Sequence, residues 1–409
     1  MSLACLTSFA SHAAQGATWD SIPQATLDER WPVLSTRSLD ISSLDRGSGG
    51  KQDWSLAAEA DAFAGSGVLR LLRAEEDLPR LHPSRSKEHA MAGARAMVSA
   101  SSSSWEVSAF VRQFFTGSAR DGALQIVRSY TAREQLPEGK SLALDARLRL
   151  VDQRGLGLAR SWPISLSAGS TPLQITVGTQ FFRLAGFAEF SSEGQILRSA
   201  NQYDFGGTAS YRDSRRVFEG YGQSGSQGQG AGIDLSLAWQ PNDRSMVLAS
   251  IVNAWSLARI AEVASQELRL RSDARIVDDQ GFLISQPSIE GKYSAKNLNV
   301  RLAPVTSVAF AHTWAVSEIM GLRSTTGLPL ITTGVRLQRT DALDLRSAWA
   351  SAPVALGCYA VAEYEFRFGS KGLGLRCGWG QVILRSDASN PQAAKSLGLS
   401  FALYNRFSL

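Results

Sequence analysis

The sequence lacks the features that mark a helical membrane protein or a metalloprotein. No run of about 18 apolar residues occurs in the 409-residue chain, so no membrane-spanning helix is predicted. The cysteines are few, Cys5, Cys358 and Cys377, and they have no metal-ligand spacing. Helix start and stop signals are scarce, whereas glycine, with 36 residues, is frequent. The sequence therefore indicates an all-β chain and points to no metal or cofactor.

Lysine is also scarce. The chain has 42 basic residues and a net charge of +5, but most of the basic residues are arginines. These arginines are spread along the chain, often at every second residue, whereas a nucleic-acid-binding protein gathers basic residues in blocks. The pattern predicts no nucleic-acid partner.

Enzyme motifs are missing as well. The four histidines are His12, His82, His89 and His312, and only His312 lies in a clear alternating segment. Ser317 lies five residues further on and therefore points to the opposite face of a strand, which argues against a catalytic His–Ser pair. We interpret His312 as a hydrogen-bonded or interfacial histidine and predict that the protein is not an enzyme.

What the sequence does contain is a period of two, which is clearest near its end. From Leu356 to Phe368 the even-numbered residues are apolar, while the odd-numbered ones include Glu363, Glu365 and Arg367. Successive side chains of a strand point to opposite faces, so this segment predicts a strand with one apolar and one charged face.

A second strand is predicted to return from this one after a tight turn at Gly369-Ser370. Its apolar residues, from Leu373 to Ile383, have odd numbers, as pairing across a two-residue turn requires. The same register places Cys358 near Gln381 and Cys377 near Ala362, which argues against a disulfide between the two cysteines.

The same alternation recurs from Gln52 onward and predicts about sixteen strands, within a range of 14 to 18. Asn201–Gly230 shows no period and predicts an extracellular or inward-folded loop, with a flexible linker between soluble domains as the alternative. The predicted strands before Val354 include Trp54–Ala62, Trp105–Phe115, Ala123–Tyr130, Ser141–Asp152, Gly155–Ala168, Leu173–Phe190, Gly230–Gln240, Met246–Ala258, Gln266–Asp278, Phe282–Ser294, Leu298–Ala303, Val308–Ile319, Pro329–Arg339 and Leu343–Trp349.

The chain closes on one more alternating strand, with Leu397, Leu399, Phe401, Leu403 and Phe407 on one face. This ending resembles the terminal strand of bacterial outer-membrane β-barrels, and it departs from that pattern at the last residue, which is Leu409 where Phe is usual. The resemblance implies an outer-membrane location and recognition by the barrel-insertion machinery.

Strand length and aromatic placement favour a membrane barrel over a soluble one. Many segments have about the 9–11 residues needed to cross a bilayer at a tilt. Tyr364, Phe366, Phe368 and Trp239 lie near the ends of apolar faces, as an interfacial girdle would. A soluble all-β protein, either a propeller or tandem sandwiches, is the alternative, although no repeat of about 40 residues supports propeller blades.

We therefore predict an all-β, antiparallel transmembrane β-barrel over residues 51–409, surrounded by outer-membrane lipids. Residues 1–15 resemble the remnant of a signal peptide, and residues 16–50 are predicted to form a periplasmic arm or a plug.

If the apolar faces meet lipid, the opposite faces line a lumen rich in arginine, which binds carboxylate and phosphate groups. The functional hypothesis is a channel or exporter for hydrophilic, preferentially anionic solutes or polymers. The alternative is that opposite charges pair across strands and fill the lumen, giving a non-conducting barrel that anchors other envelope proteins. The predicted pore-lining residues are Arg147, Arg149, Arg269, Arg271, Arg275, Arg301, Arg346, Glu363, Glu365, Arg367 and Arg376.

Overall fold

The computed structural model describes residues 53–408 except for 82–85, 103, 165–172, 200–201, 216–226, 243–244, 273–274, 278–282, 286–288, 316–329, 341–342, 356–357 and 378. The predicted signal-peptide remnant (1–15), the predicted arm or plug (16–50) and Cys5 lie outside the described residues. Within the described residues, no helix is long and apolar enough to cross a membrane.

Seventeen strands form one antiparallel sheet, and its first strand pairs with its last, so the sheet closes into a barrel. The wall before the middle of the chain consists of β1 (Asp53–Ser66), β2 (Lys87–Ser101), β3 (Trp105–Arg120), β4 (Ser141–Ala143), β5 (Ala146–Ile164), β6 (Leu173–Ser199), β7 (Gln202–Asp213) and β8 (Gly228–Asn242). It continues with β9 (Ser245–Arg271), β12 (Ile289–Val300), β13 (Val305–Ala315), β14 (Leu330–Arg339), β15 (Asp344–Ala355), β16 (Cys358–Glu365), β17 (Lys371–Cys377), β18 (Gly380–Ser386) and β19 (Ser396–Ser408).

Three positions in the wall are each shared by two strands. β7 and β8 both pair with β6 and β9, β12 and β13 both pair with β9, and β4 continues the position of β5 beside β6. The closed barrel therefore has 14 strands. This count lies at the lower end of the predicted range.

Several predicted boundaries are wrong for identifiable reasons. Ser141–Asp152 and Gly155–Ala168 mostly belong to one strand, β5, because the break between them is only a β-bulge at Asp152 and Gln153. Residues 123–130 lie in a helix, α4 (Asp121–Ala132), and the stretch predicted to be irregular, Asn201–Gly230, contains β7.

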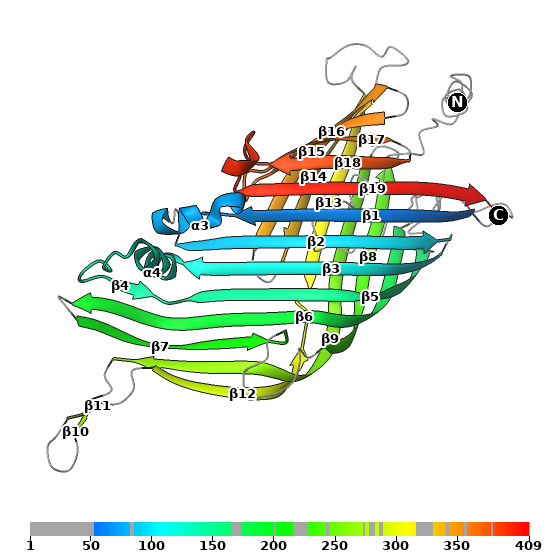
Figure 1. The fold of residues 1–409 in the computed structure, drawn as a ribbon. Helices are drawn as coiled ribbons and strands as arrows, with labels where there is room; N and C mark the ends of the chain where they lie inside the picture. The colour runs from blue at the N-terminus through cyan, green and yellow to red at the C-terminus, as the bar shows by residue number, and fades with distance from the viewer. Residues whose placement is uncertain are drawn as a thin grey trace, which may run out of the picture.

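The two ends of the barrel differ. Short helices, η2 (Leu71–Arg73), α3 (Ala74–Asp77) and η3 (Leu78–Arg80), lie at one end with α4 and η4 (Pro391–Ala393), and the small hairpin of β10 (Arg275–Val277) and β11 (Leu283–Ser285) extends from the same end (Figure 1). β1 begins and β19 ends at the opposite end (Figure 1). Outer-membrane barrels have longer loops outside the cell and short turns in the periplasm. The helical end is therefore extracellular.

The outer surface carries an apolar band. Outward-facing side chains such as Val98, Val107, Leu156, Phe181 and Leu373 are all more than half exposed in the protein alone. Exposed tryptophans mark the periplasmic edge of this band, at Trp105, Trp162, Trp314 and Trp379. Such a band with an aromatic girdle matches the lipid-facing surface of a membrane barrel.

Two of the four aromatic residues predicted to form an interfacial girdle lie on the outer surface. Tyr364 and Phe366 face outward, with ring centroids 5.0 Å apart. Phe368 is instead buried inside the barrel, 6.0 Å from the ring of Phe63, because it lies in the loop after β16, where the alternation of the strand has ended. Trp239 is half-buried.

The interior of the barrel contains apolar side chains as well as charged ones. One cluster joins Phe63 on β1 and Met91 on β2 to Val252 on β9 and Val305 on β13, with Leu343, Leu345 and Phe368. Since β1 and β9 lie on opposite sides of the 14-stranded wall, this cluster spans the lumen. A second cluster, which includes Phe110, Phe182 and Ile260, fills the region beside it.

The hairpin of β16 and β17 has another register than the one predicted. The Glu365 N–H donates to the Ser370 carbonyl at 2.8 Å, so the turn is centred two residues before Gly369-Ser370. Moving the turn by two residues moves the pairing by four, and Cys377 lies opposite Cys358 instead of Ala362. The two cysteines form a disulfide, with Cα atoms 4.2 Å apart, so the prediction against it is wrong.

The predicted return strand is also interrupted. β17 ends at Cys377 and β18 begins at Gly380, so the side chains of Gln381 and Ile383 point into the barrel, while Val382 and Leu384 face outward. A reversal between the two strands had not been predicted because Trp379 continues the alternation of Leu373 and Leu375.

Candidate functional site: the lumen and the extracellular vestibule

A buried ion-pair cluster lies on the inner face of β16, β18, β19 and β1. The Arg385 guanidinium is 3.3 Å from Asp61 and 3.1 Å from Glu363, and it donates to the Ser400 hydroxyl at 2.6 Å. These three charged side chains are at most 4% exposed. Ser400 in turn donates to Asp61. None of these three charged groups is therefore accessible to solvent.

Glycine makes the contact between Arg385 and Glu363 sterically feasible. The two residues lie on β18 and β16, with β17 between them, and Gly372 of β17 pairs with both. A Cβ atom on Gly372 would lie 3.1 Å from the Cβ of Glu363 and 3.3 Å from the Cγ of Arg385. The alternating glycines of this strand thus clear a path across it for the longer side chains of its neighbours.

A second polar network crosses the opposite part of the lumen. The Gln180 carboxamide accepts from Arg112 at 3.1 Å and donates to Asp234 at 3.0 Å and to Asn253 at 2.8 Å. Gln153 also donates to Gln180 at 3.3 Å. Arg112 further stacks over Phe110, 3.9 Å from the ring centroid. These hydrogen bonds tie β3, β5, β6, β8 and β9 together.

Above these networks a cavity of about 840 Å³ opens at the extracellular end, which we call the vestibule. Serine and threonine side chains line it together with five basic and four acidic residues. The basic residues are Lys87, Arg120, Arg147, Arg269 and Lys292, and the acidic ones are Asp145, Glu193, Glu267 and Glu290.

The pairing of β5, β6, β7 and β9 brings the residues of the vestibule wall together. Arg147 pairs with Ser191, which pairs with Ser210, which pairs with Glu267, so one row crosses β5, β6, β7 and β9. Glu267 receives a bond of 2.7 Å from Lys296, and Arg120 lies 2.9 Å from Asp145. Arg147 and Arg269 make no ion pair with any other described residue. Within the described part of the chain, no carboxylate neutralises these two guanidinium groups, so they can donate to a bound solute.

The structure separates the predicted pore-lining residues into different environments. Arg147 and Arg269 line the vestibule, and Arg149 donates to the Arg301 carbonyl at 2.7 Å. Glu363 and Arg376 are buried in the lumen, while Arg271, at the end of β9, and Arg301, after β12, are exposed. Arg275 belongs to the β10–β11 hairpin, which is not part of the barrel wall.

Arg346 and Arg367 also lie away from the lumen lining, and Glu365 has a structural role. Arg346 pairs with the exposed Leu337 and faces outward, because the inward face of β15 is that of Leu345 and Ser347. Arg367 lies in the loop after β16, where its N–H and that of Phe368 donate to the carboxylate of Glu365. Glu365 therefore holds this loop.

Sequence analysis missed the residues that bond most extensively in the lumen. Asp61, Arg95, Arg112, Gln180 and Arg385 are all buried, and Arg95 pairs with Glu59 at 2.9 Å. In the sequence, each of these polar residues alternates with small or apolar ones. The same pattern is expected for a strand whose polar face is exposed to water. Only the cross-strand register shows that they meet.

The interpretation of His312 as a hydrogen-bonded histidine is confirmed. Its Nδ1 is 2.8 Å from the Ser245 hydroxyl, and its ring packs edge-on against Trp314. Among the described residues, no cluster of three or more metal-ligating side chains occurs.

No protein-family model and no curated protein sequence matches the chain. Among solved structures, it is similar to a deletion mutant of the monoaromatic hydrocarbon channel TodX, with 9% identity and a TM-score of 0.35 over 91% of this chain and 94% of that one. The translocator domain of autotransporter NalP from Neisseria meningitidis gives 9% identity and 0.30 over 90% and 91%. The outer-membrane protease OmpT from Escherichia coli gives 9% and 0.24 over 90% and 100%.

At these TM-scores the comparisons carry no argument about activity. The class of protein is decided instead by the closed antiparallel wall, the apolar band on its outer surface and the exposed tryptophans at the edge of that band. This is an outer-membrane β-barrel.

Proposed function

We propose that this barrel is an outer-membrane channel that binds hydrophilic solutes in its extracellular vestibule and is closed beneath it in this conformation. The main observation behind this proposal is the vestibule. Its volume of about 840 Å³ falls within the roughly 300–1,000 Å³ typical of sites for small molecules. It also opens toward the side from which an outer-membrane channel receives its solutes.

The lining of the vestibule suggests the class of solute. Arg147 and Arg269 present planar donors that suit carboxylate or phosphate groups. Ser191, Thr208 and Ser210 add hydroxyl groups that bond sugars and other polyols. Since five basic residues face four acidic ones, the field favours anions only weakly. Polyhydroxylated solutes that carry one acidic group match this lining best.

The filled lumen favours a second candidate, a non-conducting barrel that anchors other envelope proteins. The apolar cluster around Phe63 spans the lumen, and Arg385 is neutralised by its own carboxylates. Conduction would require the β1–β2 wall to separate from Val252 and Val305. The two candidates therefore differ in whether this contact opens.

Planar-bilayer recordings under a salt gradient test the channel. The wild-type protein is expected to open intermittently, and Phe63→Leu is expected to raise the open fraction because it weakens the contact across the lumen. Arg147→Gln/Arg269→Gln should move the reversal potential toward that of cations. Arg346→Gln, which removes an arginine from the outer face, is the control and should change nothing.

Each variant is first checked for folding by its heat-modifiable migration on a detergent gel. Absence of conductance in both the wild type and Phe63→Leu, with both folded, would favour the anchoring barrel. Conductance with an unchanged reversal potential in Arg147→Gln/Arg269→Gln would remove these arginines from the path of the solute.

A further inference from the structure

One strand of the wall has a neighbour on one side only. β12 pairs with the extracellular part of β9, from Ala258 to Leu270, and no other described strand pairs with it. β13, which follows β12 in the chain, begins lower, beside Val252 of β9, and has β14 on its other side. The second edge of β12 is therefore unpaired within the described residues.

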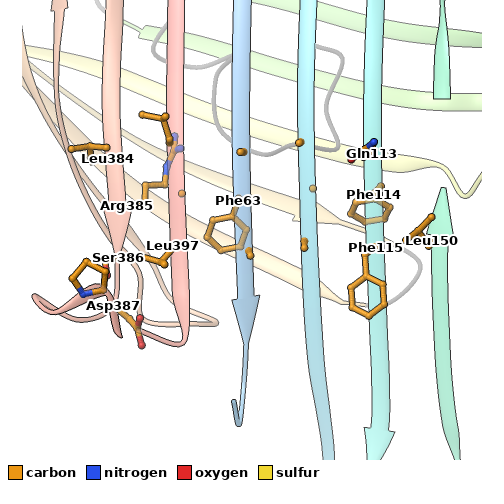
Figure 2. Close-up of a pocket in the computed structure, with 18 of the residues that line it drawn as sticks. Phe63, Gln113, Phe114, Phe115, Leu150, Leu384, Arg385, Ser386, Asp387 and Leu397 are labelled. Carbon is orange, nitrogen blue, oxygen red and sulfur yellow. The ribbon is translucent and has the colours of Figure 1, made fainter. Parts of the chain in front are cut away.

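The other long strands of the wall are paired on both edges. Figure 2 shows β1, which carries Phe63, and β3, which carries Phe114 and Phe115. β1 lies between β19 and β2, and β3 lies between β2 and β5. β4 pairs with β6 alone, but it has three residues and packs against α4. In the described part of the chain, β12 is thus the only strand of more than three residues with a free edge.

The free edge lies outside the bilayer, on the extracellular side. Residues 245–257 of β9 already exceed the 9–11 residues or so that cross a bilayer at a tilt, and β12 pairs only with the residues above them. An unpaired strand edge in hydrocarbon would also leave backbone N–H and C=O groups without hydrogen-bond partners, which lipid cannot supply. The edge of β12 therefore meets water.

Both faces of β12 are open as well. Residues 290–293, 295–297 and 299 are exposed, and successive residues of a strand point to opposite faces. The strand has 12 residues, and on its free side every second residue presents an N–H and a C=O group. A free edge of this length is a template to which another extended chain can add as a strand.

The charge on one face of β12 indicates which chain would fit. Lys292 and Lys296 lie four residues apart on this face, and both are exposed. Lys296 donates to Glu267 of β9 at 2.7 Å, whereas Lys292 makes no ion pair with any described residue. Glu290 is the only acidic residue of the strand. An antiparallel neighbour would place two of its own residues, also four apart, beside the lysines, where carboxylates are favoured.

The opposite face of β12 leaves room for large side chains. Tyr293 lies on this face, where its hydroxyl accepts a hydrogen bond of 2.8 Å from Gln266 of β9. Its neighbours along the same face are Gly291 and Ala295, which have little or no side chain. Aromatic or β-branched residues of an added strand can therefore pack over these small residues and against the ring of Tyr293.

A second copy of the chain does not suit this edge. Two copies in one membrane both have β12 running from the extracellular end toward the bilayer, so their edges could meet only as parallel strands. Lys292 and Lys296 would then lie beside the same lysines of the other copy, where like charges repel. Lysine on an exposed edge is a common means of preventing identical strands from pairing.

We infer that β12 accepts an extended segment of another protein at the cell surface as an added antiparallel strand, and that this segment carries acidic side chains four residues apart. The free backbone edge supplies hydrogen bonds that do not depend on the side chains of the partner. Lys292 and Lys296 supply the preference for an acidic segment. Since Lys292 also lines the vestibule, the added strand would extend the vestibule wall.

Fluorescence anisotropy with the folded, detergent-purified protein tests the charge preference. The probe is a labelled peptide of about ten residues in which threonine and valine alternate, with glutamate in place of two threonines four positions apart. The same peptide with lysine at these two positions is the comparison. The glutamate peptide should bind at least about tenfold more tightly than the lysine peptide.

Two variants locate the preference on β12. Lys292→Glu/Lys296→Glu should reverse the order of the two peptides. Lys371→Glu is the matched control, since Lys371 is also exposed but lies on β17, which is paired on both edges. It should keep the wild-type order. Heat-modifiable migration on a detergent gel checks that each variant is folded.

Two N-methylated forms of the glutamate peptide separate strand addition from simple charge attraction. One form is methylated at the valines and the other at the residues between them. In an added strand only one of these two sets of amides faces β12, so one form should bind and the other should not. Hydrogen–deuterium exchange of residues 289–300 should slow when the unmethylated peptide binds.

Four results would overturn the inference. The folded wild type might fail to bind the glutamate peptide, or it might bind both N-methylated forms equally, and either result would exclude strand addition. An unchanged preference for glutamate in Lys292→Glu/Lys296→Glu would remove the two lysines from recognition. Slower exchange of residues 289–300 at higher protein concentration without peptide would show that a second copy occupies the edge.

Discussion

Ion pairs inside this barrel occur in two environments, one buried and one exposed to solvent. In the buried cluster, Arg385 lies against Asp61 and Glu363, and all three side chains are at most 4% exposed. In the vestibule wall, Lys296 and Glu267 form a comparable pair, but their side chains are 45% and 52% exposed. Charge on an inward face is therefore no sign of a pore by itself. Burial decides whether the charge stabilises the wall or stays available to a solute.

The largest difference between the two regions should appear in stability. Arg385→Met leaves two carboxylates buried without their partner, which costs about 3–5 kcal/mol. Arg147→Met, in the open vestibule, should cost less than about 1 kcal/mol. Urea unfolding of each variant in lipid vesicles, followed by tryptophan fluorescence, measures both changes.

A rescue variant sharpens this comparison. Asp61→Asn/Glu363→Gln in the Arg385→Met background should restore part of the lost stability, because it removes the uncompensated charges. Equal losses for Arg385→Met and Arg147→Met would show that the two regions do not differ as burial indicates.

The disulfide allows the cluster to be weakened while the vestibule stays intact. Cys358 and Cys377 join β16 to β17 at the periplasmic end, on the hairpin that carries Glu363. Cys358→Ser/Cys377→Ser should lower the unfolding free energy by about 3 kcal/mol, the value expected for a closed loop of this size. Binding of a solute at Arg147 and Arg269 should not change. A parallel loss of solute affinity would show that the two regions are coupled.

The smallest expected effect lies at the extracellular rim, where the ion pair of Arg70 and Asp77 helps to hold the segment after β1. Arg70 donates to Asp77 through its backbone N–H at 2.8 Å and through its guanidinium at 2.6 Å. These hydrogen bonds lower the pKa of Asp77 below its usual value. The stabilisation is therefore present above the usual aspartate pKa and is lost as the pH falls through the lowered value.

Hydrogen–deuterium exchange of residues 70–80, corrected for the intrinsic pH dependence, measures this effect. Exchange should be constant from pH 7 to 5 and rise only below about pH 4. Asp77→Asn should show fast exchange already at pH 7. A rise between pH 7 and 5 would mean that another group holds this segment.

Sequence alternation predicted the faces of the strands well but not how they meet. The outward positions of Tyr364, Phe366 and Leu373 follow directly from a period of two. The disulfide could not be derived, because the position of the turn sets the register and the Gly369-Ser370 pair marked it two residues too late.

The candidate site was less predictable for a related reason. Alternation cannot tell a buried inward charge from a solvated one, so Glu363 and Arg147 had the same signal although one is in the cluster and the other in the vestibule. Arg346 was placed inward because its neighbours on β15, Leu345 and Trp349, are the apolar residues of that strand. Here the apolar face is the inner one, since it packs across a filled lumen.

The wall of the barrel has very unequal heights. β6 and β9 have 27 residues each, whereas β16 has eight and β17 and β18 have seven. About 9–11 residues are needed to cross a bilayer of ordinary thickness. We therefore expect the membrane to be locally thinned against β16–β18, with a gradient of thickness around one molecule. Such a gradient disorders lipid packing on the short side, so neighbouring proteins and lipids would meet two different bilayers on the two sides of this barrel.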